Sequence, residues 1–169
     1  MPGLPGRDDE PREARGADAQ SPGGPTVRVS ALILADDGLL LVRQRRQGDN
    51  YWLLPGGGVK FGEPLAVALR RELLEELGLE VVPGRLLALA EAISDDMSRY
   101  PKHVVHVICE ARAADPAARV APGDEAVLEA RYFGREELAG LDLRPPIAPF
   151  LRRCFDALPA DLQYLGVVW

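Results

Sequence analysis

Cysteines, aromatic residues and long apolar runs are all scarce in this chain of 169 residues. Its 2 cysteines, Cys109 and Cys154, are too few for a disulfide-rich scaffold, and we interpret both as buried free thiols. No apolar run is long enough to cross a membrane, and the first residues contain no hydrophobic signal segment. These absences predict a cytoplasmic protein with no membrane partner.

Positive charge is also in short supply. The chain has 20 Lys and Arg residues against 26 Asp and Glu residues, a formal net charge of −6. An acidic chain is a poor nonspecific binder of nucleic acid, because such binding depends on neutralising phosphates with Lys and Arg. We therefore expect no DNA partner. The 47% apolar content is sufficient for a sizeable core, and the length suits one domain.

The chain divides into two regions by composition. Residues 1–25 are rich in Pro, Gly and charged residues and show no apolar period, which is typical of a disordered tail. We expect a single folded domain over residues 26–169. Within it, Asp36-Asp37-Gly38 is a turn signal that predicts a hairpin between the first two strands. We predict strands over 27–34, 39–42, 51–54, 81–93, 103–109 and 130–133, helices over 64–77 and about 147–158, and a polar loop over 94–101.

The segment 57–79 joins a glycine loop to a helix rich in carboxylates. Glu72, Glu75 and Glu76 are three and four positions apart, so they share one face of that helix. Three like charges on one face repel unless a positive charge lies among them. A hard cation such as Mg²⁺ or Mn²⁺ prefers oxygen ligands, and no Cys or His in the segment favours zinc. The pattern therefore predicts a divalent-cation site, although a charged helix face is also typical of solvated surface.

The residues around this helix favour a divalent-cation site over a solvated surface. Pro64 suits the first helical turn and Gly78 suits the C-terminus, which places the helix at about 64–77. An apolar stripe of Ala66, Leu69, Leu73 and Leu77 runs beside the carboxylates, so one flank can pack on a sheet while the next faces a cleft. The preceding run 55–58 has a flexible backbone that can bring carbonyls to a metal and amides to phosphate.

Nine positions in this segment carry a family resemblance. Residues Gly57, Glu63, Arg71, Glu72, Leu73, Glu75, Glu76, Gly78 and Leu79 match every defined position in the signature of the Nudix (MutT-like) hydrolases. The chain therefore resembles that family over this segment and its flanking strands.

The resemblance implies a fold and a chemistry. The fold is an α/β/α sandwich with a mixed β-sheet, and the reaction is hydrolysis of a nucleoside diphosphate linked to another group. The resemblance makes Glu72, Glu75 and Glu76 metal ligands or water activators and Arg71 their orienting partner. A carbonyl of Gly56 or Gly57 would be a further ligand. Glu63 would lie near the metal as a secondary participant.

Several residues outside the helix are candidates for binding substrate. Arg43, Arg45 and Arg46 follow the second strand and suit phosphate contacts, although solubilising surface charge fits them equally well. Backbone amides of Gly57 and Gly58 are placed to approach phosphate. Tyr51 and its neighbour Trp52 have the shape to stack on a base, but an aromatic beside a core strand more often packs.

A second acidic stretch lies before the last predicted strand. In many proteins of the family the corresponding loop supplies another catalytic carboxylate, which here selects Asp124 and Glu125, with Glu129 as a weaker candidate. A solvated acidic loop is the alternative. His103 and His106 fall on opposite faces of one strand, so we expect structural roles for both.

We interpret the chain as a metal-dependent pyrophosphohydrolase that uses Mg²⁺ or Mn²⁺. Its substrate would be a small nucleotide, such as a nucleoside triphosphate, a nucleotide sugar or ADP-ribose, and water would attack phosphorus. The alternatives are a nucleotide-binding or regulatory module without turnover and an RNA 5′-end pyrophosphohydrolase. The sequence leaves the substrate and the choice between monomer and homodimer open.

Overall fold

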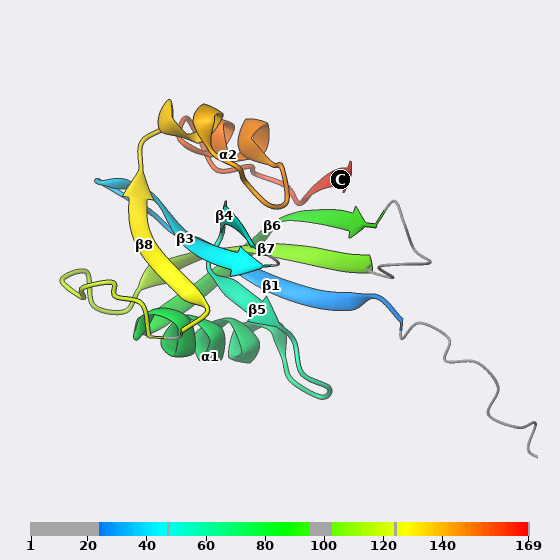
Figure 1. Cartoon of the computed structure of the whole chain (residues 1–169), viewed down its shortest axis with the longest axis horizontal. Coiled ribbons are helices and arrows are strands. Elements are labelled where there is room, and N and C mark those ends of the chain that lie inside the picture. Colours follow the sequence, from blue (N-terminus) through cyan, green and yellow to red (C-terminus); the bar gives the residue numbers. More distant parts are fainter. Residues whose placement is uncertain (1–23, 47, 95–102, 124, 169) are drawn as a thin grey trace, which may run out of the picture.

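Two β-sheets lie between helix α1 (Leu65–Leu77) and helix α2 (Ala148–Cys154) in a computed structural model of the chain (Figure 1). The structure describes residues 24–46, 48–94, 103–123 and 125–168. Helix α1 covers one side of the sheets and α2 covers the other. The fold is therefore the α/β/α sandwich that the family resemblance implies.

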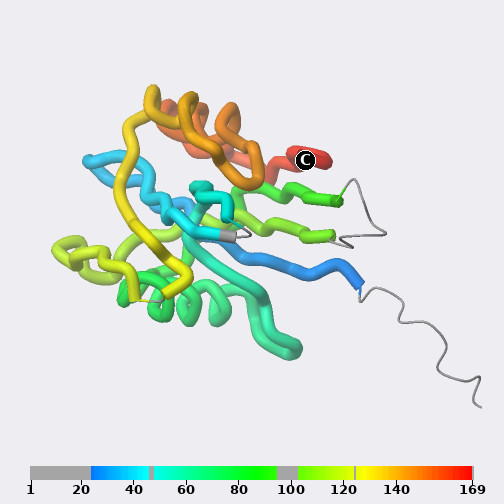
Figure 2. The backbone as a smooth tube through the Cα atoms, in the orientation of Figure 1, coloured from blue at the N-terminus to red at the C-terminus, as the bar shows by residue number. Residues whose placement is uncertain are grey.

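The larger sheet is mixed and has five strands in the order β5-β1-β7-β6-β9. Strand β1 runs parallel to β7, and β9 runs parallel to β6, whereas the β1–β5 and β6–β7 pairs are antiparallel. The backbone trace shows β1, β7 and β6 side by side (Figure 2). The strands are β1 (Thr26–Leu32), β5 (Gly56–Gly58), β6 (Val81–Ile93), β7 (His103–Ala113) and β9 (Gln163–Val167).

The smaller sheet is antiparallel and is built around β3 (Gly38–Arg46). Strand β3 pairs with β2 (Leu34–Ala35), β4 (Asp49–Leu53) and β8 (Val127–Phe133). Alternate residues of β3 enter two different cores: Leu40 belongs to the cluster on the α1 side, and Leu41 to the cluster on the α2 side. Because both faces are buried there, residues 39–42 of β3 are apolar without alternation, as expected for a central strand.

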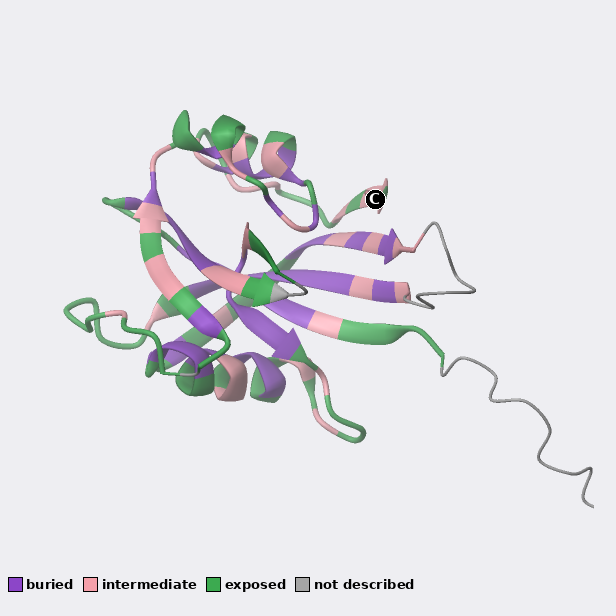
Figure 3. Ribbon diagram, in the orientation of Figure 1, coloured by how far each residue is buried: buried purple, intermediate pink, exposed green. Residues whose placement is uncertain are grey.

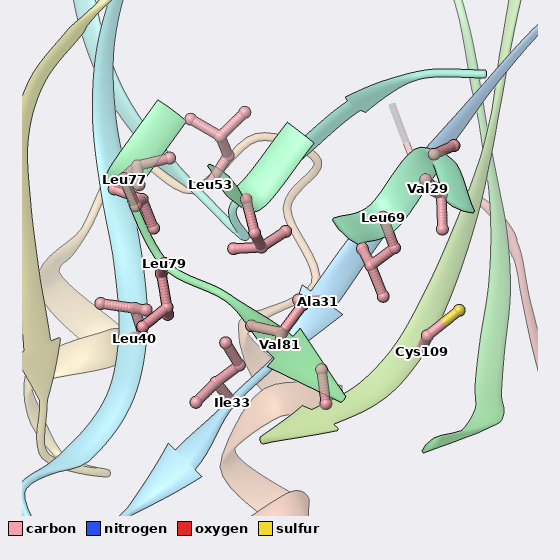
Figure 4. Packing of buried hydrophobic residues seen from close by; sticks show 14 of the residues in the cluster. Val29, Ala31, Ile33, Leu40, Leu53, Leu69, Leu77, Leu79, Val81 and Cys109 are labelled. Atoms are coloured by element: carbon pink, nitrogen blue, oxygen red, sulfur yellow. The ribbon is translucent and has the colours of Figure 1, made fainter. Parts of the chain in front are cut away.

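Helix α1 is attached to the sheets by the three leucines of its predicted apolar stripe, whereas Ala66, the fourth predicted member, is exposed. Leu69, Leu73 and Leu77 are buried and lie in one cluster with Val29 and Leu40 (Figure 4). The opposite side of the helix is exposed (Figure 3). The predicted bounds are confirmed: the helix follows Pro64 and ends at Gly78, which adopts the left-handed conformation with φ of 61°.

Helix α2 closes the second core. Phe150, Leu151 and Cys154 are buried in a cluster with Leu32 and Ile108 of the five-stranded sheet. The predicted C-terminal helix is confirmed, but it is shorter than predicted, and a 3-10 helix, η1 (Glu137–Gly140), precedes it. Both cysteines are buried free thiols, as predicted, and burial raises the pKa of each to about 11.

The predicted hairpin between residues 27–34 and 39–42 is wrong in its pairing. Strand β1 lies in the five-stranded sheet against β5 and β7, and only the two residues of β2 turn back on β3. The chain therefore changes sheet at Ile33, between β1 and β2. Runs buried on both faces carry no alternation that would assign them to a sheet.

Other predicted strands differ mainly in extent. Strand β6 has the predicted bounds, whereas β7 and β8 are longer than predicted. Strands β5 and β9 were not predicted, because a run of three glycines and a half-exposed segment have no apolar period. The predicted tail up to residue 23 and the loop residues 95–101 lie outside the described residues. Of the helices in the described part of the chain, none is long and apolar enough to cross a membrane.

Candidate functional site

Arg71 of α1 donates hydrogen bonds to three carboxylates and a backbone carbonyl. Its Nε and Nη2 donate to the two carboxylate oxygens of Glu63 at 2.8 and 2.9 Å. Its Nη1 donates to Glu72 at 2.6 Å and to Glu75 at 3.2 Å, and Nη2 also donates to the carbonyl of Gly58 at 3.0 Å. The guanidinium therefore joins the glycine loop to the acidic face of the helix, consistent with an orienting partner.

The Arg71–Glu63 pair is the strongest electrostatic contact of this group. Hydrogen bonds from Arg71 and from the backbone N–H of Lys60 lower the pKa of Glu63 to about 2. The same pair raises the pKa of Arg71. Both groups are therefore charged at neutral pH, and the fork of the guanidinium fits the carboxylate with two bonds.

Glu76 is buried and is held separately from Arg71. One carboxylate oxygen accepts from the backbone N–H of Gly56 at 2.9 Å, and the other accepts from the side-chain amide of Gln44 at 3.0 Å. Sequence reasoning missed Gln44. Alternation along β3 was the available signal, because Gln44 lies two residues after the buried Val42 and so shares its face toward α1.

Two glycines of the loop, Gly56 and Gly57, lie in close contact with neighbouring atoms. A β-carbon on Gly57 would lie 2.0 Å from Oε2 of Glu72, so the carboxylate rests directly on the loop backbone. Gly56 has φ of 139°, and a β-carbon there would lie 2.2 Å from the carbonyl oxygen of Val29. Gly56 therefore requires glycine, whereas at Gly57 glycine allows the Glu72 carboxylate to lie against the backbone.

The oxygen donors fit Mg²⁺ or Mn²⁺ in chemical type. Within the described residues, no group of three Asp, Glu, His or Cys side chains is placed to hold an ion by itself. Glu72 and Glu75 instead share Nη1 of Arg71, and Glu76 binds Gly56 and Gln44. Mg²⁺ typically takes one or two carboxylates and completes its shell with water and substrate phosphates, so this donor set suits it.

The predicted phosphate-binding arginines of β3 have protein partners. Arg43 forms an ion pair with Glu129 at 2.9 Å, and Nε of Arg45 donates to Asn50 at 3.1 Å. Both project from β3 on the face opposite to Gln44, because side chains alternate along a strand. The side chain of Arg46 lies outside the described part of the structure.

The two aromatic candidates have different surroundings. Trp52 packs edge-on against Phe133 with ring centroids 4.6 Å apart, a structural contact. Tyr51 is half-buried and pairs with Gln44 across β3 and β4, which places it on the side of Glu76. The guanidinium carbon of Arg144 lies 4.7 Å from the centroid of its ring.

The loop before β8 reaches the last turn of α1 through its backbone. The N–H of Gly123 donates to the carbonyl of Glu76 at 2.8 Å. Asp124 lies outside the described residues, and the side chain of Glu125 is exposed to solvent. The structure thus brings this loop to the site.

The two histidines lie in different places. His103 is bound to Glu91 at 2.9 Å near the end of the sheet, whereas His106 is buried beside a pocket. They do not share one site.

A pocket opens beside the carboxylate site, between β1, β7 and the start of α2. Its wall is mostly apolar, with the polar side chains of Arg28, Ser30, His106 and Arg144 among the lining. Sequence reasoning missed this pocket because residues 143–151 reach it only through tertiary packing. A charged residue between Val27 and Val29 was the one local signal for Arg28. The lining is Arg28, Ser30, Leu53, Leu54, His106, Ile108, Leu143, Arg144, Pro145, Ile147 and Leu151.

The family model for the NUDIX domain matches residues 24–157 of this chain. The chain therefore belongs to the Nudix family, and it is a hydrolase of that family. Among curated proteins it is similar to phosphatase NudJ of Escherichia coli K12, with 25% identity over 134 residues that cover 79% of this chain and 84% of NudJ.

Solved structures agree with the family and the fold. A MutT protein of Methanosarcina mazei superposes with a TM-score of 0.64 and 27% identity, covering 80% of this chain and 96% of that protein. An ADP-ribose pyrophosphatase of Streptococcus suis has a TM-score of 0.60 at 21% identity, covering 83% of this chain and 98% of that protein. The second likeness establishes the fold alone.

Proposed function

We propose that the chain hydrolyses the diphosphate bond of a small nucleotide, with a divalent cation bound among Glu72, Glu75 and Glu76. The observation that carries the proposal is the arrangement around the glycine loop. Arg71 holds Glu63, Glu72 and Glu75, while Glu76 is held by the backbone N–H of Gly56 in that loop. The membership of the Nudix hydrolases supports this reading.

The cation would be Mg²⁺ or Mn²⁺, and when bound it neutralises the diphosphate and lowers the pKa of a bound water. Glu72, whose carboxylate lies against Gly57, and the exposed Glu75 would be ligands. Glu76 would be a fixed ligand, because two donors already orient its carboxylate. The carbonyl of Gly56 or Gly57 would add a backbone oxygen.

The other residues of the site would hold the substrate and move a proton. Tyr51, which lies on the side of Glu76, and the backbone amides of Gly57 and Gly58 would hold the substrate. A carboxylate of α1 or Glu125 would take the proton from the attacking water. Rate–pH profiles of the Glu75→Gln and Glu125→Gln variants distinguish these acceptors, because loss of the base removes the rise in rate toward alkaline pH.

The substrate class follows from a panel of nucleoside triphosphates, nucleotide sugars, ADP-ribose, dinucleoside polyphosphates, coenzyme A and RNA with a 5′ triphosphate. NudJ is a phosphatase and the Streptococcus suis protein is an ADP-ribose pyrophosphatase, so these chemistries belong in the panel. Each compound is incubated with Mg²⁺, Mn²⁺ or EDTA, and its products are measured: a nucleoside monophosphate from the nucleotides, 3′,5′-ADP from coenzyme A and pyrophosphate from the RNA. A tenfold preference in kcat/KM corresponds to about 1.4 kcal/mol of differential transition-state binding and identifies the class.

The matched variants are Glu72→Gln and Glu80→Gln. Glu72 contacts Arg71 and the glycine loop, whereas Glu80 is exposed and lies just beyond the motif. We expect the first substitution to abolish cleavage and the second to leave it unchanged. Stabilisation by both metal and nucleotide without cleavage of any compound would instead support the binding module. Stabilisation by neither would refute the assignment of the site.

A further inference from the structure

Arg28 lies where the pocket meets the carboxylate site. Its side chain lines the pocket together with Ser30, two residues further along β1. Its Nη2 donates to the carbonyl of Gly56, and the N–H of that same glycine donates to Glu76 at 2.9 Å. One glycine therefore connects the pocket arginine to the carboxylate of α1.

The guanidinium of Arg28 lies near acidic side chains. Within the described part of the chain, it forms no ion pair with any of them. Burial lowers the pKa of its guanidinium, and the nearby carboxylates of Glu76 and Glu72 act in the opposite direction. Its guanidinium donates to the neutral carbonyl of Gly56, which is a weaker acceptor than an anionic oxygen. A phosphate bound beside Gly56 would therefore be a stronger hydrogen-bond acceptor for Arg28 than the carbonyl of Gly56 is.

Among the side chains that the structure describes, Arg43 and Arg45 of β3 and Arg144 of the pocket are bound to protein carboxylates or amides. Arg43 pairs with Glu129, and Arg144 donates to Asp142 at 3.0 Å and reaches Asp49 at 3.5 Å. Their charges are balanced locally. Arg28, by contrast, forms no ion pair in the described part of the chain, and it lies between the pocket and the carboxylates of α1.

We propose that Arg28 binds the phosphate chain of the substrate, exchanging the carbonyl of Gly56 for phosphate oxygens. The inference rests on the proposed function, since the phosphates are those of its substrate. Guanidinium suits the task because its planar fork donates two hydrogen bonds to one phosphate. The exchange also frees the carbonyl of Gly56, one of the two glycine oxygens assigned to the metal site.

The test uses inorganic pyrophosphate, the unit that all candidate substrates share. Binding to the full chain is measured by calorimetry with saturating Mg²⁺ for the wild type, Arg28→Met and Arg28→Lys. The matched control is Arg85→Met, because Arg85 also projects from a strand and donates to a backbone carbonyl, that of Ala160, at 2.8 Å. Binding of Mn²⁺ alone is measured for the same proteins.

We expect Arg28→Met to bind pyrophosphate at least tenfold more weakly than the wild type and the Arg85 control. Arg28→Lys should be intermediate, because it keeps the charge and loses the fork. Mn²⁺ alone should bind to Arg28→Met at least as tightly as to the wild type, since a positive charge near two carboxylates has been removed. A purely structural role would weaken Mn²⁺ binding as well.

Three results would overturn the inference: unchanged pyrophosphate binding in both Arg28 variants, a parallel loss of Mn²⁺ affinity, or no pyrophosphate binding by the wild type. If Arg28→Met does not fold, the Lys variant decides alone. Failure of the proposed function gives a different result from failure of this inference. A wild type that cleaves nucleotides but binds pyrophosphate independently of Arg28 refutes only this inference. One that binds through Arg28 and cleaves nothing refutes only the function.

Discussion

The carboxylate of Glu72 rests on the α-carbon of Gly57. A β-carbon at position 57 would lie 2.0 Å from Oε2 and 2.1 Å from the carboxyl carbon. This contact places a charged group of the helix against the loop backbone, and no residue other than glycine permits it. Substitution of Gly57 therefore tests directly whether the position of the Glu72 carboxylate matters for catalysis.

Gly57→Ala should lower kcat/KM at least about tenfold by displacing the carboxylate of Glu72. The stability cost should be only about 1 kcal/mol, because the displaced atoms end a flexible side chain. Nucleotide cleavage and urea unfolding measure the two effects. Gly58→Ala is the matched control, since a β-carbon there meets no atom within 4 Å. Equal activity in the two variants would contradict the prediction.

Glu76→Gln should leave the fold intact and reduce turnover by roughly a hundredfold. The amide keeps the shape but loses the charge, and it has one acceptor where Gly56 and Gln44 require two. We expect a loss of about 1–3 kcal/mol in the free energy of unfolding from the unsatisfied donor. The increase in melting temperature caused by Mg²⁺ should disappear as well. Near-normal turnover at saturating Mg²⁺ would remove Glu76 from the proposed site.

Glu63→Gln should remove a pH-dependent part of the stability. The folded-state pKa of Glu63 is about 2, below its ordinary value of 4.5, because Arg71 binds the charged form. The stabilisation is thus fully present above pH 4.5 and is lost as the pH falls toward 2. The wild type should melt above the variant at pH 7, and the difference should vanish near pH 2. A difference independent of pH would show that packing, not charge, is responsible.

Deletion of residues 1–25 should change neither the melting temperature nor kcat/KM. The prediction rests on composition, since a segment rich in Pro, Gly and charge buries too little apolar surface to offset its ordering entropy. Differential scanning calorimetry and the cleavage assay compare the deletion with the full chain. A substantial loss of either quantity would show that the segment contacts the domain or its substrate.

Local sequence determined the acidic helix and its surroundings. The stripe of Leu69, Leu73 and Leu77, with Pro64 before it and Gly78 after it, was enough to predict α1 within one residue. The same spacing predicted that the carboxylates share a face. These features are local, because 3.6-residue periodicity and helix-terminal geometry involve only neighbouring residues.

Only the tertiary structure decided which sheet each apolar strand joins and which polar side chains meet the helix. Strand β1 pairs with β7, which follows it by more than seventy residues, and no periodicity encodes that choice. Other contacts between distant segments complete the site: β1 pairs with β5, where Arg28 meets Gly56, and α1 packs where Glu76 meets Gln44 of β3. Fully buried strands lack alternation, so the sequence marks them as core without specifying their neighbours. Alternation along β3 does separate Gln44 from Arg43, but which face meets the site depends on where α1 packs.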